Sequence, residues 1–213
     1  MVPSPQPSRA RLVALPSPTL AQADDATLAR AASSGDPRAT GVLWDRFSPL
    51  ARRMLRRTLG PQAAVESLLQ EVFVRAIEQL PNLADSAQLR PFMVGVTARV
   101  LASELRRRRM RRLLRLRPRQ EADGGIGPSD AGVRTALSAL YRILDELDAD
   151  ARLAFTLRHF EGLQVSEVAM ATDASLSRAK RRLARANARV QAELQRDATL
   201  GAYAAAVGSG DSP

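Results

Sequence analysis

Apolar residues recur every three or four positions through most of this chain, the spacing that places them on one side of an α-helix. No stretch alternates apolar and polar residues as a half-buried strand would. The pattern therefore predicts an all-α protein. The longest apolar stripe comprises Val65, Leu68, Leu69, Val72, Phe73, Ala76, Ile77 and Leu80.

Glycine and proline divide this helical pattern into segments. Short apolar stripes predict helices at residues 28–34, 39–47, 50–59 and 65–80, and a further helix begins near Pro91. A Gly-Asp-Pro sequence follows the first helix and a Gly-Pro sequence follows the third, and both combinations stop one helix before the next begins. We therefore expect a bundle of helices in the first half of the chain.

Composition along the chain suggests two small helical domains joined by a flexible linker. Residues 1–23 are rich in Pro, Ser and Ala and are expected to form a disordered tail. Helical periodicity occupies residues 24–117 and resumes over 135–197. The intervening residues 118–134 are rich in Gly and Pro, which is typical of a linker. Residues 198–213 are expected to form a flexible Ala/Gly tail.

Residues 163–186 have the pattern of a helix-turn-helix. Val165 lies at the start of a short first helix, and the Thr-Asp-Ala sequence at 172–174 suits a tight turn. Ser175 stands where its hydroxyl can accept a hydrogen bond from the free amides of the second helix. The expected buried side of that second helix comprises Leu176, Ala179, Leu183 and Ala186.

The opposite side of the second helix is polar and strongly basic. Arginine matches phosphate groups and guanine edges with paired hydrogen bonds, and a basic second helix is the usual means of entering the major groove. Such a face can also be no more than a solvated surface, but its separation from the apolar stripe favours DNA binding. The candidate DNA contacts on this helix are Ser175, Ser177, Arg178, Lys180, Arg181, Arg182 and Arg185.

The overall composition supports a polyanionic partner. The 213 residues include 32 Lys and Arg against 22 Asp and Glu, which gives a net charge of +10. Such an excess favours nucleic acid or an anionic membrane surface as a partner. Aromatic residues make up only 4%, so the core must be built from Leu, Ala and Val, which suits helices better than sheets.

The helix that begins near Pro91 leads into the most cationic segment of the chain, residues 106–119. This run can be a solvated helix end, one side of a membrane-surface helix with Met110 and Leu113 on its apolar side, or a nucleic-acid contact. We favour the nucleic-acid contact, because adjacent like charges repel each other unless a polyanion screens them. The candidate DNA contacts here are Arg106, Arg107, Arg108 and Arg109.

Several classes of function find no support in the sequence. The chain has no cysteine and a single histidine, His159, which excludes disulfides, thiol catalysis and histidine clusters. No glycine-rich loop or nucleophile elbow occurs, and the acidic residues at 145–150 occupy ordinary helix-start or exposed positions. We therefore expect a protein that is not an enzyme and that needs neither a metal nor another cofactor.

No apolar run reaches the ~18 residues that a membrane helix needs. The N-terminal apolar stretch is short and is interrupted by Pro16 and Pro18, which does not suit a signal peptide. We therefore expect a cytoplasmic protein with no membrane insertion.

Taken together, the two helical segments resemble the extracytoplasmic-function (ECF) sigma factors of bacterial RNA polymerase, over residues 26–112 and 136–195. The resemblance implies an N-terminal region 2 and a C-terminal region 4. It implies core RNA polymerase and promoter DNA as partners, and promoter-specific transcription initiation as the function. Members of this family are commonly held by an anti-sigma factor, which is therefore a further expected partner.

The resemblance also implies roles for particular residues. The segment ESLLQEVFVRAIEQL, residues 66–80, is similar to the helix that docks on the clamp helices of the polymerase β′ subunit, with Gln70 and Glu71 on its polar docking face. Residues 89–109 resemble the helix that melts and reads the −10 promoter element. Residues 147–186 resemble region 4, which reads the −35 element.

Several positions depart from the family pattern. An Asp usually lies two positions before the Leu-Gln pair of the docking helix, where this chain has Ser67. The −10 helix usually carries a Trp, an Asn and an Asp, where this chain has Phe92, Arg99 and Ser103. Phe92 and Arg99 are the candidate base contacts there. The alternative function is a free-standing helix-turn-helix regulator, or a decoy sigma factor that no longer opens promoters.

Overall fold

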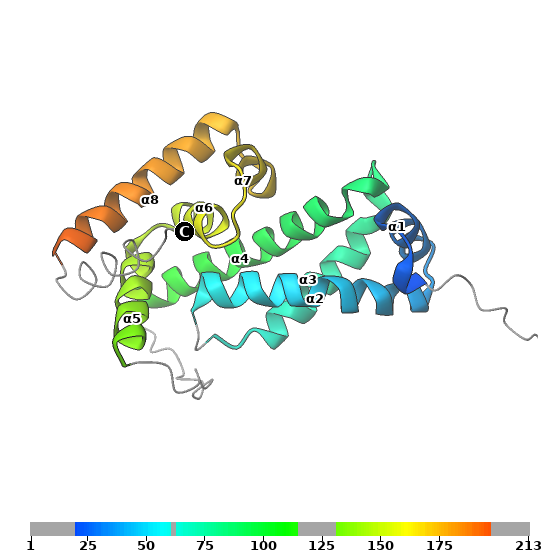
Figure 1. Cartoon of the computed structure of the whole chain (residues 1–213), viewed down its shortest axis with the longest axis horizontal. Coiled ribbons are helices and arrows are strands. Elements are labelled where there is room, and N and C mark those ends of the chain that lie inside the picture. The colour runs from blue at the N-terminus through cyan, green and yellow to red at the C-terminus, as the bar shows by residue number, and fades with distance from the viewer. Residues whose placement is uncertain (1–19, 61–62, 115–130, 197–213) are drawn as a thin grey trace, which may run out of the picture.

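The structure, a computed structural model, describes residues 20–60, 63–114 and 131–196. These three segments contain helices and no strand (Figure 1). The expected all-α fold is therefore confirmed for the part of the chain that is described. The expected tail at 198–213 and most of the expected tail at 1–23 lie outside the described residues.

Four α-helices lie in the described part of the first half of the chain. They bury the apolar stripes predicted from the sequence, and α2, α3 and α4 pack against one another around that core. A short 3-10 turn, Leu20–Gln22, precedes them, and Leu20 packs on the core, so the end of the expected tail is ordered. The helices are α1 (Asp25–Ser33), α2 (Pro37–Leu59), α3 (Glu66–Gln79) and α4 (Leu89–Leu113).

The two helices expected at 39–47 and 50–59 are one continuous helix, α2, with Pro49 inside it. A proline removes one backbone donor and crowds the preceding turn, which costs about 3 kcal/mol in a helix interior. Burial on both sides of this proline offsets that cost, since Phe47 and Ala51 are 5% and 2% exposed. Local sequence therefore predicted a break that tertiary packing overrides.

The second half contains α5 (Ala131–Glu146), α6 (Ala149–His159), α7 (Val165–Ala171) and α8 (Leu176–Arg196). The onset of α5 lies inside the segment 118–134 that the sequence assigns to a linker, and residues 115–130 lie outside the described part. Side chains of α5, α6 and α8 form a small apolar cluster that includes Ile143, Leu144 and Phe155.

The two halves pack directly against each other in one shared core. Leu153 and Leu157 of α6, Val168 of α7 and Leu183 of α8 join the apolar cluster built by α1 to α4. In Figure 1, α6 and α7 lie along α4, and α8 runs across α6. The basic side of α8 is therefore brought close to the basic end of α4.

Polar contacts fix this packing at the C-terminal end of α2. The last four carbonyl groups of an α-helix have no partner within the helix. Here all four accept hydrogen bonds, three of them from other helices. The donors are the Gly60 amide to Arg56 (2.9 Å), the Tyr141 hydroxyl to Arg57 (3.0 Å), the Arg152 guanidinium to Thr58 (2.7 Å) and the Arg108 guanidinium to Leu59 (3.2 Å).

Arg152 is a buried side chain among these donors. Its side chain is 3% exposed, donates through two nitrogens to the Thr58 carbonyl and pairs with Asp145. Burial lowers the pKa of Arg152, and the carboxylate of Asp145 opposes that effect. Beside it, the hydroxyls of Thr58 and Thr156 are hydrogen-bonded at 3.2 Å. The contact between α2 and α6 is therefore a buried polar cluster with its groups paired.

We predict that Arg152→Met lowers the free energy of unfolding by about 2 kcal/mol, because methionine fills the space but leaves the buried Thr58 carbonyl without its charged donors. Urea unfolding followed by circular dichroism measures this change. Arg196→Met is the matched control, since Arg196 is exposed and pairs only with Glu193 in the described part of the chain. Equal stabilities of the two variants would contradict the assigned role of Arg152.

Candidate nucleic-acid interface

The helix-turn-helix predicted from the sequence is formed by α7 and α8. Asp173, in the turn, has a φ of 47°, a left-handed conformation that Asp tolerates better than most residues. The Ser175 hydroxyl accepts from the Arg178 amide at 3.3 Å, which confirms Ser175 as the cap of α8. A capping box formed by Gln164 and Glu167 begins α7. Both helices of the motif therefore begin with a side chain that caps the free backbone amides of the first turn.

The buried face of α8 is the predicted one with a single exception. Ala179, Leu183 and Ala186 are buried, but Leu176 is 46% exposed. Leu176 is the first residue of α8 and projects beyond the core that the later turns contact. Of the predicted DNA contacts on this helix, Arg182 is half-buried and the others are exposed, namely Ser175, Ser177, Arg178, Lys180, Arg181 and Arg185.

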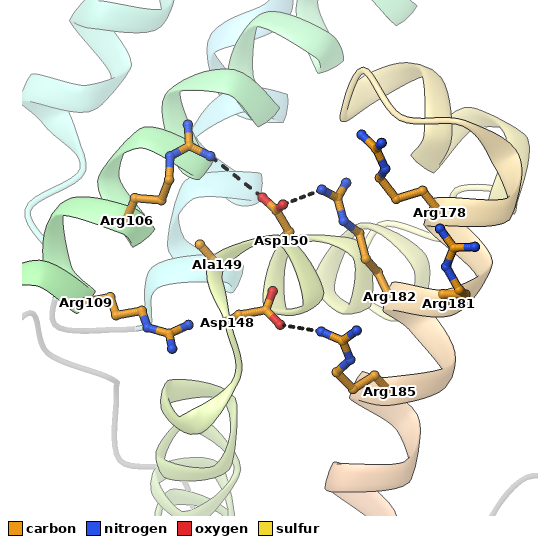
Figure 2. Close-up of a pocket in the computed structure, with 9 residues that line it drawn as sticks. All are labelled: Arg106, Arg109, Asp148, Ala149, Asp150, Arg178, Arg181, Arg182 and Arg185. Atoms are coloured by element: carbon orange, nitrogen blue, oxygen red, sulfur yellow. Dashed lines mark hydrogen bonds and ion pairs between the residues drawn. The ribbon is translucent and has the colours of Figure 1, made fainter.

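The basic faces of α4 and α8 meet across an open pocket of about 440 Å³ (Figure 2). The N-terminal turn of α6 forms the floor between them. The structure therefore brings predicted contacts from both halves of the chain to one place. The pocket is lined by Arg106 and Arg109 from α4, by Asp148, Ala149 and Asp150, and by Arg178, Arg181, Arg182 and Arg185 from α8.

Two carboxylates at the start of α6 pair with some of these arginines. Asp150 lies between the two basic helices, paired with Arg182 of α8 and, at 3.7 Å, with Arg106 of α4. Asp148 caps α6 by accepting from the Ala151 amide at 2.8 Å, and it also accepts from Arg185 at 3.2 Å. These aspartates were assigned ordinary positions from the sequence, because their partners lie on other helices.

Acidic residues of the last turn of α5 belong to the same ion-pair network. Asp145 pairs with Arg112 at 3.6 Å as well as with Arg152, and Glu146 pairs with Arg189. Because Arg189 also lowers the pKa of the Glu146 carboxyl through a hydrogen bond, this pair stays charged over the ordinary pH range. The only sequence signal for this network is the acidic run at 145–150.

The predicted contacts near the start of α4 lie away from this pocket. Phe92 is half-buried and packs against the core. Arg99 is exposed and donates to the Gln79 side chain of α3 at 2.8 Å. The predicted −10 contacts thus comprise the exposed guanidinium of Arg99 and the half-buried ring of Phe92.

Glu104, a buried carboxylate that was not among the predicted site residues, binds three arginines in the last turns of α4. Glu104 is 4% exposed and accepts from Arg107 and Arg108 at 2.7 Å and from Arg111 at 3.2 Å. Burial alone raises the pKa of Glu104, but hydrogen bonds from Arg108 and Arg107 outweigh it, so the net pKa lies below its ordinary value. Arg107 and Arg108 are thereby held by α4 itself, while Arg106 and Arg109 reach the pocket.

The predicted polymerase contacts lie on the outer side of α3. Gln70 is exposed, and Glu71 is half-exposed and pairs with Arg75 at 2.6 Å. The same side exposes Val74 and Ile77, at 55% and 39%. Ile77 was expected in the buried stripe, but it lies at that stripe's edge and faces solvent. The sequence spacing of Gln70, Val74 and Ile77 places all three on one face.

The described residues hold no cluster of three or more His, Asp or Glu side chains that could bind a metal ion. The Nε2 of His159 is hydrogen-bonded to the Oδ1 of Asn187 at 2.9 Å, and the His159 ring packs on that of Phe155, which is a structural role. Within the same three segments, no helix is long and apolar enough to cross a membrane.

A helix-turn-helix joined to a second basic helix of an all-α bundle defines a DNA-binding protein. The chain belongs to the ECF sigma factor family, whose family model matches residues 23–196. It is an RNA polymerase sigma factor that directs transcription initiation, working with RNA polymerase and DNA and carrying out no catalysis of its own.

Similar proteins are also described as RNA polymerase sigma factors. RNA polymerase sigma factor NccH of Alcaligenes xylosoxydans xylosoxydans is 28% identical over 177 residues, covering 80% of this chain and 95% of the relative. RNA polymerase sigma factor CnrH of Cupriavidus metallidurans is 27% identical over 183 residues, covering 81% and 95%. The solved structure of CnrH in complex with the cytosolic domain of CnrY matches with a TM-score of 0.58 and 25% identity, covering 82% of this chain and 99% of that one.

We predict that Glu104→Gln destabilises the protein at neutral pH by about 2 kcal/mol, because three arginines lose a charged acceptor. A carboxyl whose pKa is lowered in the folded state contributes stability that is present above its ordinary pKa of 4.5 and is lost as the pH falls below that value. The variant should therefore lose less additional stability on acidification than the parent does.

Urea unfolding at neutral pH and at about pH 3.5 measures both effects. Glu78→Gln, a change at an exposed position of α3, is the control and should leave the acid dependence unaltered. If Glu104→Gln and the parent lose equal stability on acidification, Glu104 is not the carboxylate responsible.

Proposed function

We propose that this sigma factor docks on the β′ clamp helices of core RNA polymerase through the outer face of α3. The exposed Val74 and Ile77, with the polar Gln70 and Glu71 beside them, support this surface. An apolar centre with a polar rim is the usual composition of a protein interface. In this proposal Gln70 fixes the orientation, and Ile77 supplies the apolar contact.

The same proposal assigns promoter reading to α8 and α4. The observation that supports it best is the basic side of α8, which lies opposite its buried stripe in a properly capped helix-turn-helix. Arg178 and Arg181 are the best candidates for base or phosphate contacts in the −35 element, with Ser175, Ser177 and Lys180 beside them. Arg99 and Phe92 are the candidates for contacts in the −10 element, and Arg106 to Arg109 for contacts to its backbone.

DNA reading by both surfaces requires the halves of the chain to separate. The pocket between the two basic faces has a volume of about 440 Å³, that of a small-molecule site, whereas a helix that reads DNA must enter a major groove ~12 Å wide. We infer that residues 24–117 and 135–197 move as units about the segment 118–134. Arg106 would then exchange Asp150 for a DNA phosphate, whereas the pairs of Arg182 with Asp150 and of Arg185 with Asp148 lie within one unit and are kept.

Regulation by a partner is part of the proposal. One similar solved structure is that of CnrH with the cytosolic domain of CnrY, which supports an anti-sigma domain as a partner of this chain. Such a partner would hold the halves together in the cytoplasm and keep both DNA surfaces from the promoter.

Binding to core RNA polymerase, followed by run-off transcription from the DNA upstream of its own gene, tests the proposed function. We predict that Ile77→Asp weakens polymerase binding by about tenfold or more, because a charge replaces an apolar contact at the interface centre. Arg38→Asp, at an exposed position of α2, is the control. If Ile77→Asp binds core RNA polymerase as tightly as the parent does, the outer face of α3 is not the docking surface.

The transcription assay separates the alternatives. Polymerase binding with a transcript supports a working sigma factor, and binding without a transcript indicates a decoy that does not open promoters. DNA binding without polymerase binding indicates a free-standing regulator.

We further predict that Arg181→Ala weakens promoter binding by ~1–3 kcal/mol and lowers the slope of log affinity against log salt by about one, if it contacts a phosphate. Fluorescence anisotropy of labelled promoter DNA with the holoenzyme measures both quantities. Arg38→Ala serves as the control. An Arg181→Ala holoenzyme with unaltered affinity and slope would remove this residue from the interface.

A further inference from the structure

The pocket between α4 and α8 carries a charge imbalance that the described residues do not neutralise. Six guanidinium groups and two carboxylates line it, an excess of four positive charges. Arginine stays protonated in proteins, so the imbalance persists at every ordinary pH. The described residues supply no further carboxylate to this lining.

Three of the six arginines have no ion-pair partner among the described residues. Arg109 lies on the α4 wall, and Arg178 and Arg181 lie on the α8 wall (Figure 2). The two aspartates are engaged by other arginines, Asp150 by Arg106 and Arg182. Unpaired cations therefore face the same space from both walls, and a bound anion would convert their mutual repulsion into attraction.

The size and chemistry of the pocket define the class of anion. A volume of about 440 Å³ falls within the range of small-molecule sites. The planar fork of arginine fits two oxygens of one phosphate group, and unpaired arginines on two separate helices call for more than one such group. No aromatic residue lines the pocket, so a nucleobase would find no ring to stack on.

We propose that this pocket binds a small polyphosphate anion, with Arg109, Arg178 and Arg181 holding phosphate groups between α4 and α8. The anion is recognised through a chain of two or three linked phosphates, whether inorganic or carried by a nucleotide. Because it contacts both walls, it stabilises the packing of the two halves. If the basic faces are the DNA contacts proposed above, the anion also competes with promoter DNA.

Isothermal titration of the full-length protein with sodium tripolyphosphate, at constant ionic strength, tests this site without DNA or polymerase. We expect saturable binding to one site, with sulfate binding about tenfold or more weakly because it offers a single anionic group. Adenosine triphosphate should bind about as tightly as tripolyphosphate, since only its phosphates are contacted. Markedly tighter binding of the nucleotide would overturn recognition through phosphate alone.

Arg109→Gln and Arg178→Gln should each weaken tripolyphosphate binding by about tenfold. Both residues are exposed and unpaired within the described segments, so the variants retain the fold. Arg38→Gln, far from the pocket at the start of α2, should bind like the parent. Absence of saturable binding, or equal binding by all three variants, would overturn the proposal.

Thermal unfolding supplies a second measurement. Tripolyphosphate should raise the unfolding temperature of the parent and of Arg38→Gln, because a ligand that binds only the folded state stabilises it, and should raise that of Arg109→Gln much less. Neither measurement involves transcription, so failure here leaves the proposed function standing, and failure of the proposed function leaves this site testable.

Discussion

The arrangement of the described helices depends on the hydrogen bonds at the last turn of α2. A helix end that is covered by other elements must find donors for its free carbonyls, because a buried carbonyl without a donor costs about 1–3 kcal/mol. In this protein the donors come from α4, α5 and α6. Arg152 links the first half of the chain to the second through that requirement, and the positions of α7 and α8 follow from the position of α6.

The electrostatics of the molecule follow from this packing. A chain with a large excess of arginine brings its two most basic helices together, and it does so by placing Asp150 between them and burying Glu104 among the arginines of α4. In the proposed complex with nucleic acid, a phosphate group would take the place of Asp150 beside Arg106. The ion pairs of Asp150 and Glu104 thus neutralise part of the arginine charge within the protein itself.

Local periodicity predicted the helices well but could not predict how they pair. The apolar stripe of α3 and the cap of α8 at Ser175 follow from spacing and side-chain chemistry within one turn. The break expected between residues 47 and 50 was wrong, since the packing that keeps α2 continuous through Pro49 comes from other helices. The acidic residues at 145–150 appeared ordinary for the same reason, because Asp150 and Arg182 are 32 positions apart. Long-range ion pairs of this kind leave no local signal.

The polar character of the contact between α2 and α6 has a consequence for the order in which the chain folds. The Arg152 donors lie 94 positions after the Thr58 carbonyl that they contact, and the Tyr141 hydroxyl lies 84 positions after that of Arg57. During synthesis the first half is therefore complete before these partners emerge, and water must hydrate the end of α2 in the meantime. A helix end that tolerates hydration on the ribosome can be hydrated again, so the separation of the halves proposed above would reverse the last step of folding.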